Sequence, residues 1–246
     1  MKIAILGATS GMGRSLARLA AARGHQVVVM GRNAAELERS VADLQVRHQA
    51  QASAVTCDLD EPAGFANALN LCRQAHGGSR LDVVVVTAAR FGTQDQLEKD
   101  EALLAQVLNT NFTATILFCE QARRLLLEQG GGTLCVFSSV AGDRGRKPIA
   151  LYGSTKAGLS HYLESLDHRH HADGLRVVTV KPGFVHTSMT SGLKPPPFAG
   201  QPDQVAADVL RAIERGTPVV YTPAMWRLVM LVIRNLPRFV MRKVGF

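Results

Sequence analysis

The segment Lys2-Ile-Ala-Ile-Leu-Gly7-Ala-Thr-Ser-Gly11-Met-Gly13 joins a short apolar run to a glycine-rich turn. The apolar run predicts a buried strand, and leucine and alanine at helical spacing follow the turn as far as Gly24. In such a strand–turn–helix unit, glycine permits the tight turn and lets a pyrophosphate approach the free amides of the helix N-terminus. We therefore predict a dinucleotide-binding site whose turn contains Gly7, Thr9, Ser10, Gly11, Met12 and Gly13.

A second predicted strand, Gln26–Met30, is followed by Gly31-Arg32-Asn33. Folds that bind NAD place a carboxylate here for the ribose diol, whereas this chain has a guanidinium. Arg32 suits a ribose 2′-phosphate through charge-assisted hydrogen bonds, which favours NADP(H) and keeps NAD(H) as the alternative. The other interpretation of Arg32 is a solvated loop residue. Asn33 is predicted to cap a helix that runs to about His48.

Two further apolar runs predict the next strands. Asp58 follows the run Ala52–Cys57, where it either receives the adenine amino group or caps the helix after Pro62, and both interpretations stay open. The run Leu81–Thr87 is apolar almost throughout, as expected for a strand buried on both faces. Ala88 at its exit is small enough for a cofactor to lie close.

The composition predicts one α/β domain. With 246 residues, 46% of them apolar, and strands alternating with helices, the chain can bury one sizeable core. The net charge of +8 suits phosphate-bearing ligands or an anionic membrane, whereas 5% aromatic residues and no nucleic-acid-binding motif argue against nucleic acid. We expect no metal. Because the four cysteines show no CxxC pairing and the N-terminus enters a strand without a leader, we expect reduced thiols and a cytoplasmic protein.

Ser139 and the run Tyr152-Gly-Ser-Thr-Lys156 carry groups suited to proton transfer. Ser139 follows the apolar run 133–137, which predicts a strand, and open α/β sheets bind ligands beyond the carboxyl ends of their strands. On a helix, Tyr152 and Lys156 share one face, so the ammonium comes close to the phenol. We expect this charge to lower the phenol pKa from about 10 and to make Tyr152 a usable acid and base.

Asn111 follows a helical pattern through Leu103 and Val107. A buried asparagine needs hydrogen-bond partners. Asn111 is either a satisfied amide that bends the helix or the residue that holds a water in a proton relay, and the residues alone favour the first interpretation.

Taken together, these motifs resemble those of the short-chain dehydrogenase/reductase family over nearly the whole chain. The family order is Gly7-x-x-x-Gly11-x-Gly13, Asn111, Ser139, Tyr152-x-x-x-Lys156 and Pro182-Gly183-x-Val185-x-Thr187. The resemblance implies a doubly wound parallel sheet of Rossmann type, with strand order 3-2-1-4-5-6-7, in a homodimer or homotetramer. It also implies a catalytic tetrad of Asn111, Ser139, Tyr152 and Lys156, and cofactor contacts from Tyr152, Lys156, Pro182, Gly183, Val185 and Thr187.

The resemblance also implies the reaction, in which an NAD(P)-dependent enzyme interconverts a ketone and a secondary alcohol by hydride transfer. Tyr152 would donate the proton and Ser139 would position the carbonyl oxygen. Lys156 would lower the phenol pKa and bind the nicotinamide ribose, and Asn111 would hold the relay water. Thr187 would bind the nicotinamide carboxamide. A dinucleotide-bound regulator without turnover is the other class of function, and the intact tetrad argues against it.

Two positions depart from the family pattern. Leu6 replaces the threonine that usually precedes the first glycine, and Val86-Thr-Ala-Ala89 replaces Asn-Asn-Ala-Gly after the fourth strand. Neither change removes a reacting group, but both put in doubt the usual hydrogen bonds that brace the cofactor loop.

The second half is similar to a narrower group, the keto-reductase subunits of decaprenylphosphoryl-ribose 2′-epimerase. The matching stretches are Gly142-Asp-Arg144, Tyr152–Leu159, Tyr221–Arg227 and Leu236-Pro-Arg238. This similarity implies a lipid-linked 2-keto sugar as substrate and a flavoprotein oxidase as partner. A general ketoreductase of a soluble small molecule is the alternative.

Two segments outside the motifs are assigned to the substrate. Met189, Leu193, the prolines 195–197 and Phe198 form an irregular stretch before a helix that begins near Pro202, and we expect a lid there. Residues 1–222 are expected to form the reductase domain and residues 223–246 a basic amphipathic tail, whose helix Pro237 should break. The tail either docks at a subunit interface or the active-site mouth, or forms a peripheral membrane contact through a stripe of Arg227, Arg234, Arg238 and Arg242.

Overall fold

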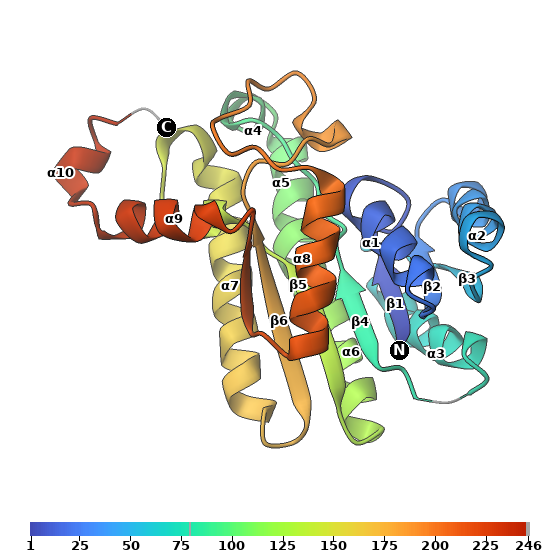
Figure 1. The fold of residues 1–246 in the computed structure, drawn as a ribbon. Helices are drawn as coiled ribbons and strands as arrows, with labels where there is room; N and C mark the ends of the chain where they lie inside the picture. The colour runs from blue at the N-terminus through green and yellow to red at the C-terminus, as the bar shows by residue number, and fades with distance from the viewer. Residues whose placement is uncertain (79, 245–246) are drawn as a thin grey trace.

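The computed structural model describes residues 1–78 and 80–244. Seven strands form one parallel sheet in the order β3-β2-β1-β4-β5-β6-β7, which confirms the predicted Rossmann-type fold (Figure 1). The strands are β1 (Lys2–Leu6), β2 (Gln26–Gly31), β3 (Ala52–Thr56), β4 (Val83–Val86), β5 (Gly132–Phe137), β6 (Leu175–Pro182) and β7 (Val219–Thr222).

Helices cover both faces of the sheet, as parallel strands with crossover connections require. Buried residues of α1, α2 and α8 pack on one face, and those of α3, α6 and α7 pack on the other. The α-helices are α1 (Gly11–Ala22), α2 (Ala34–His48), α3 (Phe65–Ala75), α4 (Gln94–Lys99), α5 (Glu101–Leu108), α6 (Thr115–Glu128), α7 (Ala150–His170), α8 (Pro202–Arg215), α9 (Met225–Asn235) and α10 (Arg238–Met241).

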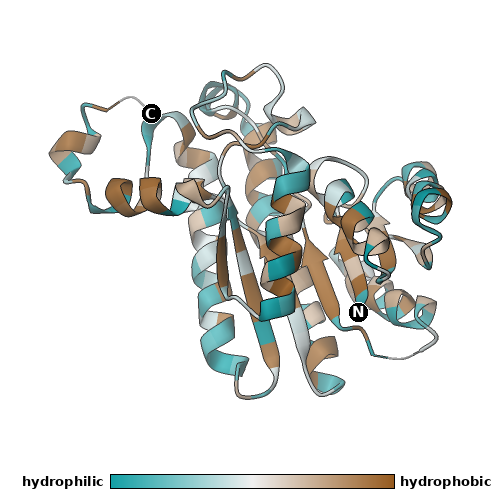
Figure 2. Cartoon of the chain, viewed as in Figure 1, coloured by the Kyte–Doolittle hydropathy of each residue, from teal (hydrophilic) through white to brown (hydrophobic). Residues whose placement is uncertain are grey.

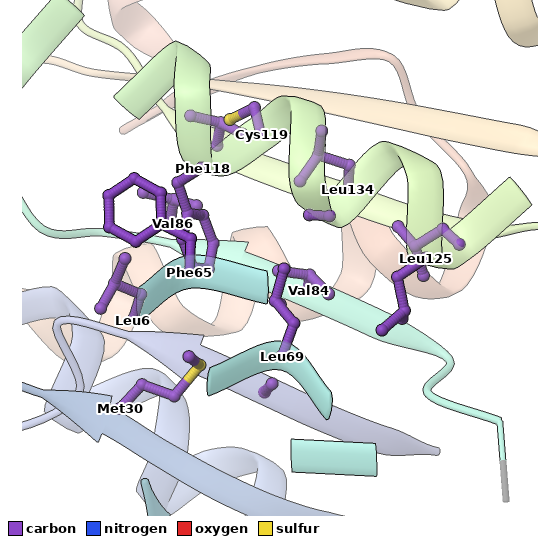
Figure 3. Packing of buried hydrophobic residues seen from close by; sticks show 14 of the residues in the cluster. Leu6, Met30, Phe65, Leu69, Val84, Val86, Phe118, Cys119, Leu125 and Leu134 are labelled. Atoms are coloured by element: carbon purple, nitrogen blue, oxygen red, sulfur yellow. The ribbon is translucent and has the colours of Figure 1, made fainter. Parts of the chain in front are cut away.

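Alternate residues of each strand face opposite layers, because the side-chain period of a strand is two. In β1, Ile3 and Ile5 belong to the core under α1 and α8, whereas Leu6 belongs to the core under α3 and α6. The hydropathy colouring shows the same division, with apolar strands in the interior and polar residues on the outer faces of the helices (Figure 2). Phe65 of α3 and Phe118 of α6 meet edge to face over the sheet with ring centroids 5.4 Å apart (Figure 3).

The structure confirms the helix boundaries that the sequence predicted at Asn33, His48 and Pro237. The Asn33 side chain accepts a hydrogen bond from the Glu36 amide at 3.1 Å and so caps α2, which ends at His48 as predicted. Pro237 separates α9 from α10, as predicted for the tail. All four cysteines are free and buried, and burial raises the pKa of Cys57 and Cys72 to about 12.

One helical run, Glu101–Glu128, is long and apolar enough to cross a membrane by length and composition alone. Its residues Phe118, Cys119 and Leu126 are instead buried against the sheet, so this run is a core helix of the fold. The run is not a uniform α-helix, since α5 and α6 are joined by a π-helical segment, Asn109–Ala114. Such segments are rare and are often found at functional sites.

Parallel connectivity places the carboxyl ends of all seven strands at the same edge of the sheet. The glycine turn after β1, Ala88 after β4, Ser139 after β5 and Thr187 after β6 therefore meet at that edge, although they are distant in sequence.

Gly142 supplies a test of the packing at this edge. A Cβ atom there would lie 2.5 Å from the Lys156 carbonyl carbon and 2.6 Å from the Ala157 amide nitrogen, both backbone atoms of α7. Because backbone atoms cannot move aside cheaply, we expect Gly142→Ala to destabilise the fold by about 1–3 kcal/mol and to lower Tm by roughly 3–10 °C. Gly145→Ala is the matched control, since a Cβ atom at Gly145 meets nothing within 4 Å. Equal melting temperatures of the two variants would contradict the close approach of this loop to α7.

Candidate active site

The glycine turn between β1 and α1 is held by Thr87 at the end of β4. The Thr87 hydroxyl lies 3.0 Å from the Leu6 carbonyl oxygen and 3.1 Å from that of Gly7. A Cβ atom on Gly13 would lie 2.2 Å from the Gly7 oxygen and 2.5 Å from the Thr87 hydroxyl, so only glycine fits. The sequence departs from the family pattern at Leu6 and at Thr87, which put the hydrogen bonds that hold the cofactor loop in doubt. The Thr87 hydroxyl makes such bonds to the loop.

A cleft of ≈ 300 Å³ opens over this turn. The N-terminus of α1 lies beside it, and the Ser10 side chain makes no capping hydrogen bond there. Backbone amides at the start of this 12-residue helix can therefore receive an anion. The predicted cofactor residues that line the cleft are Gly7, Thr9, Ser10, Gly11, Met12, Gly13, Arg32, Asp58, Ala88 and Thr187.

The two side chains assigned to the adenosine half of the cofactor both reach this cleft. Arg32 is exposed and has no hydrogen-bond or ion-pair partner within the described ranges, so its guanidinium is available to a ligand. The Asp58 carboxylate accepts a hydrogen bond from the Asp60 amide at 3.0 Å. It caps neither the short 3-10 helix Pro62–Gly64, whose N-cap residue is Glu61, nor α3, whose N-cap residue is Gly64. The structure thus rules out the capping interpretation of Asp58 and leaves this carboxylate at the cleft.

Asn111 is fully buried inside the π-helical segment. Its side-chain oxygen accepts from the Arg90 amide and its side-chain nitrogen donates to the Arg90 carbonyl, both at 2.8 Å. This pair of bonds ties the helix to the segment after β4, which agrees with the interpretation of Asn111 as a satisfied amide at a bend. Arg90 also pairs with Asp60 and bonds to Thr110, so it joins three segments at the rim of the cleft.

Ser139 and Tyr152 lie together at a second pocket, and Lys156 is buried behind them. The Ser139 hydroxyl accepts a hydrogen bond from the Ala141 amide at 3.1 Å and lies 3.4 Å from the Pro182 carbonyl oxygen. The Lys156 ammonium lies 5.8 Å from the centre of the Tyr152 ring and donates to the Phe137 carbonyl at 2.9 Å. The predicted serine, phenol and ammonium are thus brought together by β5 and α7.

The electrostatics of this group differ from the sequence-based expectation. Burial raises the pKa of Tyr152 to about 12, and hydrogen bonding with Ser139 acts in the opposite direction without cancelling it. Burial also lowers the pKa of Lys156 to about 8. The expected lowering of the phenol pKa by Lys156 is therefore wrong, because burial raises this pKa and the ammonium, which is itself desolvated, does not offset the rise. Tyr152 is accordingly a phenol at neutral pH and can give up a proton.

The second pocket has a volume of ≈ 250 Å³ and meets the cofactor cleft at Met12, Thr187 and Met189. Its lining is mostly apolar, and the Phe91 ring packs edge to face on Tyr152 at 5.2 Å. The predicted lid contributes to it through Met189, Leu193 and Pro196. The predicted cofactor residues Pro182, Gly183 and Val185 line this pocket as well, in the loop after β6.

The C-terminal tail closes the far side of this pocket. Trp226, Met230 and Ile233 of α9 are buried with Val140, and the Trp226 indole donates to the Phe198 carbonyl at 3.2 Å. A Cβ atom on Gly183 would lie 2.0 Å from the indole nitrogen, so the ring lies directly on that glycine. The sequence left open whether the tail docks at a subunit interface, at the active-site mouth or on a membrane. The inner face of α9 docks at the active-site mouth.

The arginines of the tail do not form one stripe. Arg227 and Arg234 line a groove beside α7 and β7, whereas Arg238 and Arg242 face the loop that precedes α7. The expectation of a single basic stripe is wrong, because the break at Pro237 turns α10 away from α9 (Figure 1).

Several residues of the site were not singled out from the sequence, namely Phe91, Arg90, Thr87 as a brace, and Trp226 as a pocket wall. Of these residues, only Trp226 could have been found from the sequence, because it lies within the run Tyr221–Arg227 that resembles the narrower reductase group. The described residues contain no group of three or more side chains suited to bind a metal.

The comparisons with known proteins agree with this geometry. The sequence profile of short chain dehydrogenases matches residues 1–196. An uncharacterized oxidoreductase of Mycobacterium tuberculosis is 33% identical over 98% of this chain and 96% of its own length. The human 3-oxoacyl-[acyl-carrier-protein] reductase is 30% identical over 78% of each chain. Actinorhodin polyketide ketoreductase, solved with NADPH, has the same fold with a TM-score of 0.79 and 24% identity, and the match covers 90% of this chain and 95% of that one.

Membership of one family explains three features together: the glycine turn, the order of the strands, and the serine, tyrosine and lysine that follow β5. The chain belongs to the short-chain dehydrogenase/reductase family of NAD(P)-dependent oxidoreductases.

Proposed function

We propose that this protein is an NADP(H)-dependent ketoreductase in which Tyr152 protonates the oxygen of the ketone as it is reduced. The observation that carries the proposal is the junction of the two pockets. The cofactor cleft and the pocket of Ser139 and Tyr152 share Met12, Thr187 and Met189 as walls. A ketone in the second pocket would thus lie beside the nicotinamide end of a dinucleotide in the first, where the bound cofactor would supply the hydride.

The chain's own residues would supply the proton and the charge stabilisation. Tyr152, a phenol at neutral pH because of its raised pKa, would donate to the developing alkoxide. The Ser139 hydroxyl accepts from the Ala141 amide and lies near the Pro182 carbonyl, and it would donate a hydrogen bond to the same oxygen while keeping its proton. Lys156 would stabilise the phenolate that remains and would reach the ribose. Asn111, whose side chain is engaged by Arg90, would act in the relay through a water near the π-helical backbone.

Two comparisons support the ketone and the cofactor. A relative at 30% identity reduces, by its name, a 3-oxoacyl group, and the polyketide ketoreductase of similar fold was solved with NADPH. Arg32 lines the cleft and has no partner in the part of the chain that the structure describes, which supports the preference for the 2′-phosphorylated cofactor. NAD(H) as the natural cofactor is the alternative.

A more specific proposal for the substrate rests on the similarity of the second half of the chain to the keto-reductase subunits of decaprenylphosphoryl-ribose 2′-epimerase. On that basis we propose a lipid-linked 2-keto sugar, produced by a flavoprotein oxidase, and a homodimeric or homotetrameric cytoplasmic enzyme that contacts the inner face of a membrane. The apolar side chains of the tail that remain exposed, Leu228, Leu231, Val232 and Phe239, are compatible with such a contact. A ketoreductase of a soluble small molecule is the second candidate, favoured by the limited volume of the pocket, ≈ 250 Å³.

The proton donor can be tested by Tyr152→Phe. The variant keeps the ring against Phe91 and removes only the hydroxyl, so we expect reduction of a ketone panel with NADPH to fall at least ~10²-fold with little change in NADPH affinity. Tyr162→Phe is the matched control on the same helix, since its hydroxyl bonds to Glu120 away from the pocket. Retention of most activity by Tyr152→Phe would show that another group donates the proton.

The pH dependence of reduction should report the ionisation of Lys156. As the pH rises through about 8, the ammonium loses its proton, whereas Tyr152 with a pKa of about 12 keeps its own. We therefore expect kcat/KM for reduction to be level near neutrality and to decline above about pH 8 with the slope of a single ionisation. A profile that stays level beyond about pH 10, near the usual pKa of lysine, would contradict the lowered value.

The cofactor preference can be tested by Arg32→Ala. One charge-assisted contact to the 2′-phosphate contributes on the order of 1.5–3 kcal/mol, so we expect kcat/KM for NADPH to fall roughly 10- to 150-fold and that for NADH to change little. Arg39→Ala is the control, because Arg39 pairs with Glu36 on the neighbouring helix and does not line the cleft. A wild-type enzyme that uses both cofactors equally would overturn the assignment of Arg32.

A further inference from the structure

A further cavity, distinct from the cofactor cleft and the pocket of Ser139 and Tyr152, lies between the tail and the loop that precedes α7, and we call it the basic basin. It has a volume of ≈ 580 Å³ and is lined by five cationic residues and no acidic one. Its lining consists of Arg144, Gly145, Arg146, Lys147, Ala150, Arg238, Met241 and Arg242. None of the five cations has an ion-pair partner within residues 1–78 and 80–244.

Attachment of the tail explains only part of this charge. Arg144 donates to the Leu236 carbonyl at 2.9 Å, and Lys147 donates to the Arg242 carbonyl, so these two side chains hold the tail by its backbone. The guanidinium groups of Arg146, Arg238 and Arg242 have no such role among the described contacts. Like charges around one cavity repel each other, and the repulsion is relieved when an anion enters.

Arg146 is the second observation that points to a ligand. Its Nε atom is buried and has no hydrogen-bond partner among the described residues. Burial lowers the pKa of the guanidinium, and the nearby charge of Asp143 offsets this only in part. The Asp143 carboxylate is itself occupied by Lys181 at 2.6 Å and by the Tyr221 hydroxyl at 2.8 Å. A buried donor without a partner costs free energy that an anionic ligand would recover.

Arg146 also connects the basin to the active site. Among the described residues, Arg146 alone lines both the basin and the pocket of Ser139 and Tyr152. The N-terminus of the 21-residue helix α7 opens at Ala150 in the basin, and its N-cap residue Ile149 makes no side-chain cap bond there. The helix dipole adds to the positive potential, although the Leu151 amide in the first turn is engaged by the Gln94 side chain at 3.1 Å.

We infer that the basic basin binds a phosphoryl group carried by the ketone substrate, with the carbonyl at Tyr152 and the phosphoryl oxygens at Arg146, Arg238 and Arg242. This inference rests on the proposed function, because it assigns the far end of the same substrate. A dianionic phosphoryl group matches several guanidinium forks, which bind phosphate oxygens in pairs. A carboxylate has a single charge and would leave most of the basin uncompensated.

The test compares ketoses that differ only by a phosphoryl group. The pairs are dihydroxyacetone phosphate with dihydroxyacetone, and ribulose 5-phosphate with ribulose, titrated calorimetrically into the full-length protein. We expect the phosphorylated member of at least one pair to bind at least ~10-fold more tightly, the scale of one or more charge-assisted contacts. In Arg238→Gln/Arg242→Gln, which changes two exposed side chains without a hydrogen bond or ion pair among the described residues, this preference should collapse.

Arg227→Gln is the matched control, because it removes an exposed arginine of the same tail from a different groove. It should keep the full preference for the phosphorylated ketoses. Equal affinity for both members of each pair in the wild-type protein, or an equal loss in Arg227→Gln and in the double variant, would overturn the basin as a phosphoryl site.

Two further measurements distinguish phosphoryl binding in the basin from the proposed ketoreductase activity and from binding of a lipid headgroup. Calorimetric binding does not depend on turnover, so the expected pattern without reduction of any ketose would support the basin and count against the proposed ketoreductase activity. Co-sedimentation with phosphatidylglycerol and phosphatidylcholine vesicles distinguishes a lipid headgroup from a soluble phosphate. If the double variant lost only its binding to anionic vesicles and kept its affinity for ketose phosphates, the basin would be a membrane contact and the substrate subsite would be overturned.

Discussion

The arrangement of the site depends on the buried ammonium of Lys156. It donates to the Phe137 carbonyl at the end of β5, while the Ser138 hydroxyl donates to the Lys156 carbonyl at 3.0 Å and lies 2.7 Å from Ser160. These contacts join the end of a central strand to helix α7. As a result Ser139, the next residue along the chain, and Tyr152, one turn before Lys156, line the same pocket. The same burial that orders these groups also raises the pKa of the phenol and lowers that of the ammonium.

Most of the fold could be predicted because its signals are local. Apolar runs marked the first five strands, glycine marked the turn after β1, and Asn33 capped α2 through its own side chain, whereas β6 and β7 were expected only from the family resemblance. Parallel connectivity then brings together residues that follow different strands, so the position of Ser139 after β5 was enough to place it at the active edge. The order of the strands came from the family resemblance and was confirmed.

The features that could not be predicted depend on contacts between distant segments. Thr87 braces a turn that lies 80 residues earlier in the chain, and the Arg90 backbone engages the Asn111 side chain across 21 residues. The pKa of Tyr152 depends on how completely the pocket excludes water, which spacing along a helix does not reveal. The arginines of the tail have helical spacing, yet the turn at Pro237 assigns them to two different grooves.

The most direct test of the account is the fate of the cofactor's hydride. The protein would be incubated with NADPH deuterated on C4 of the nicotinamide, in both stereochemical forms, together with a panel of ketones, and the alcohols analysed by mass spectrometry and NMR. Because the two pockets meet at Met12, Thr187 and Met189, the account predicts deuterium on the carbinol carbon from only one of the two forms. Tight NADPH binding without deuterium in any alcohol would contradict the assignment of this site to ketone reduction.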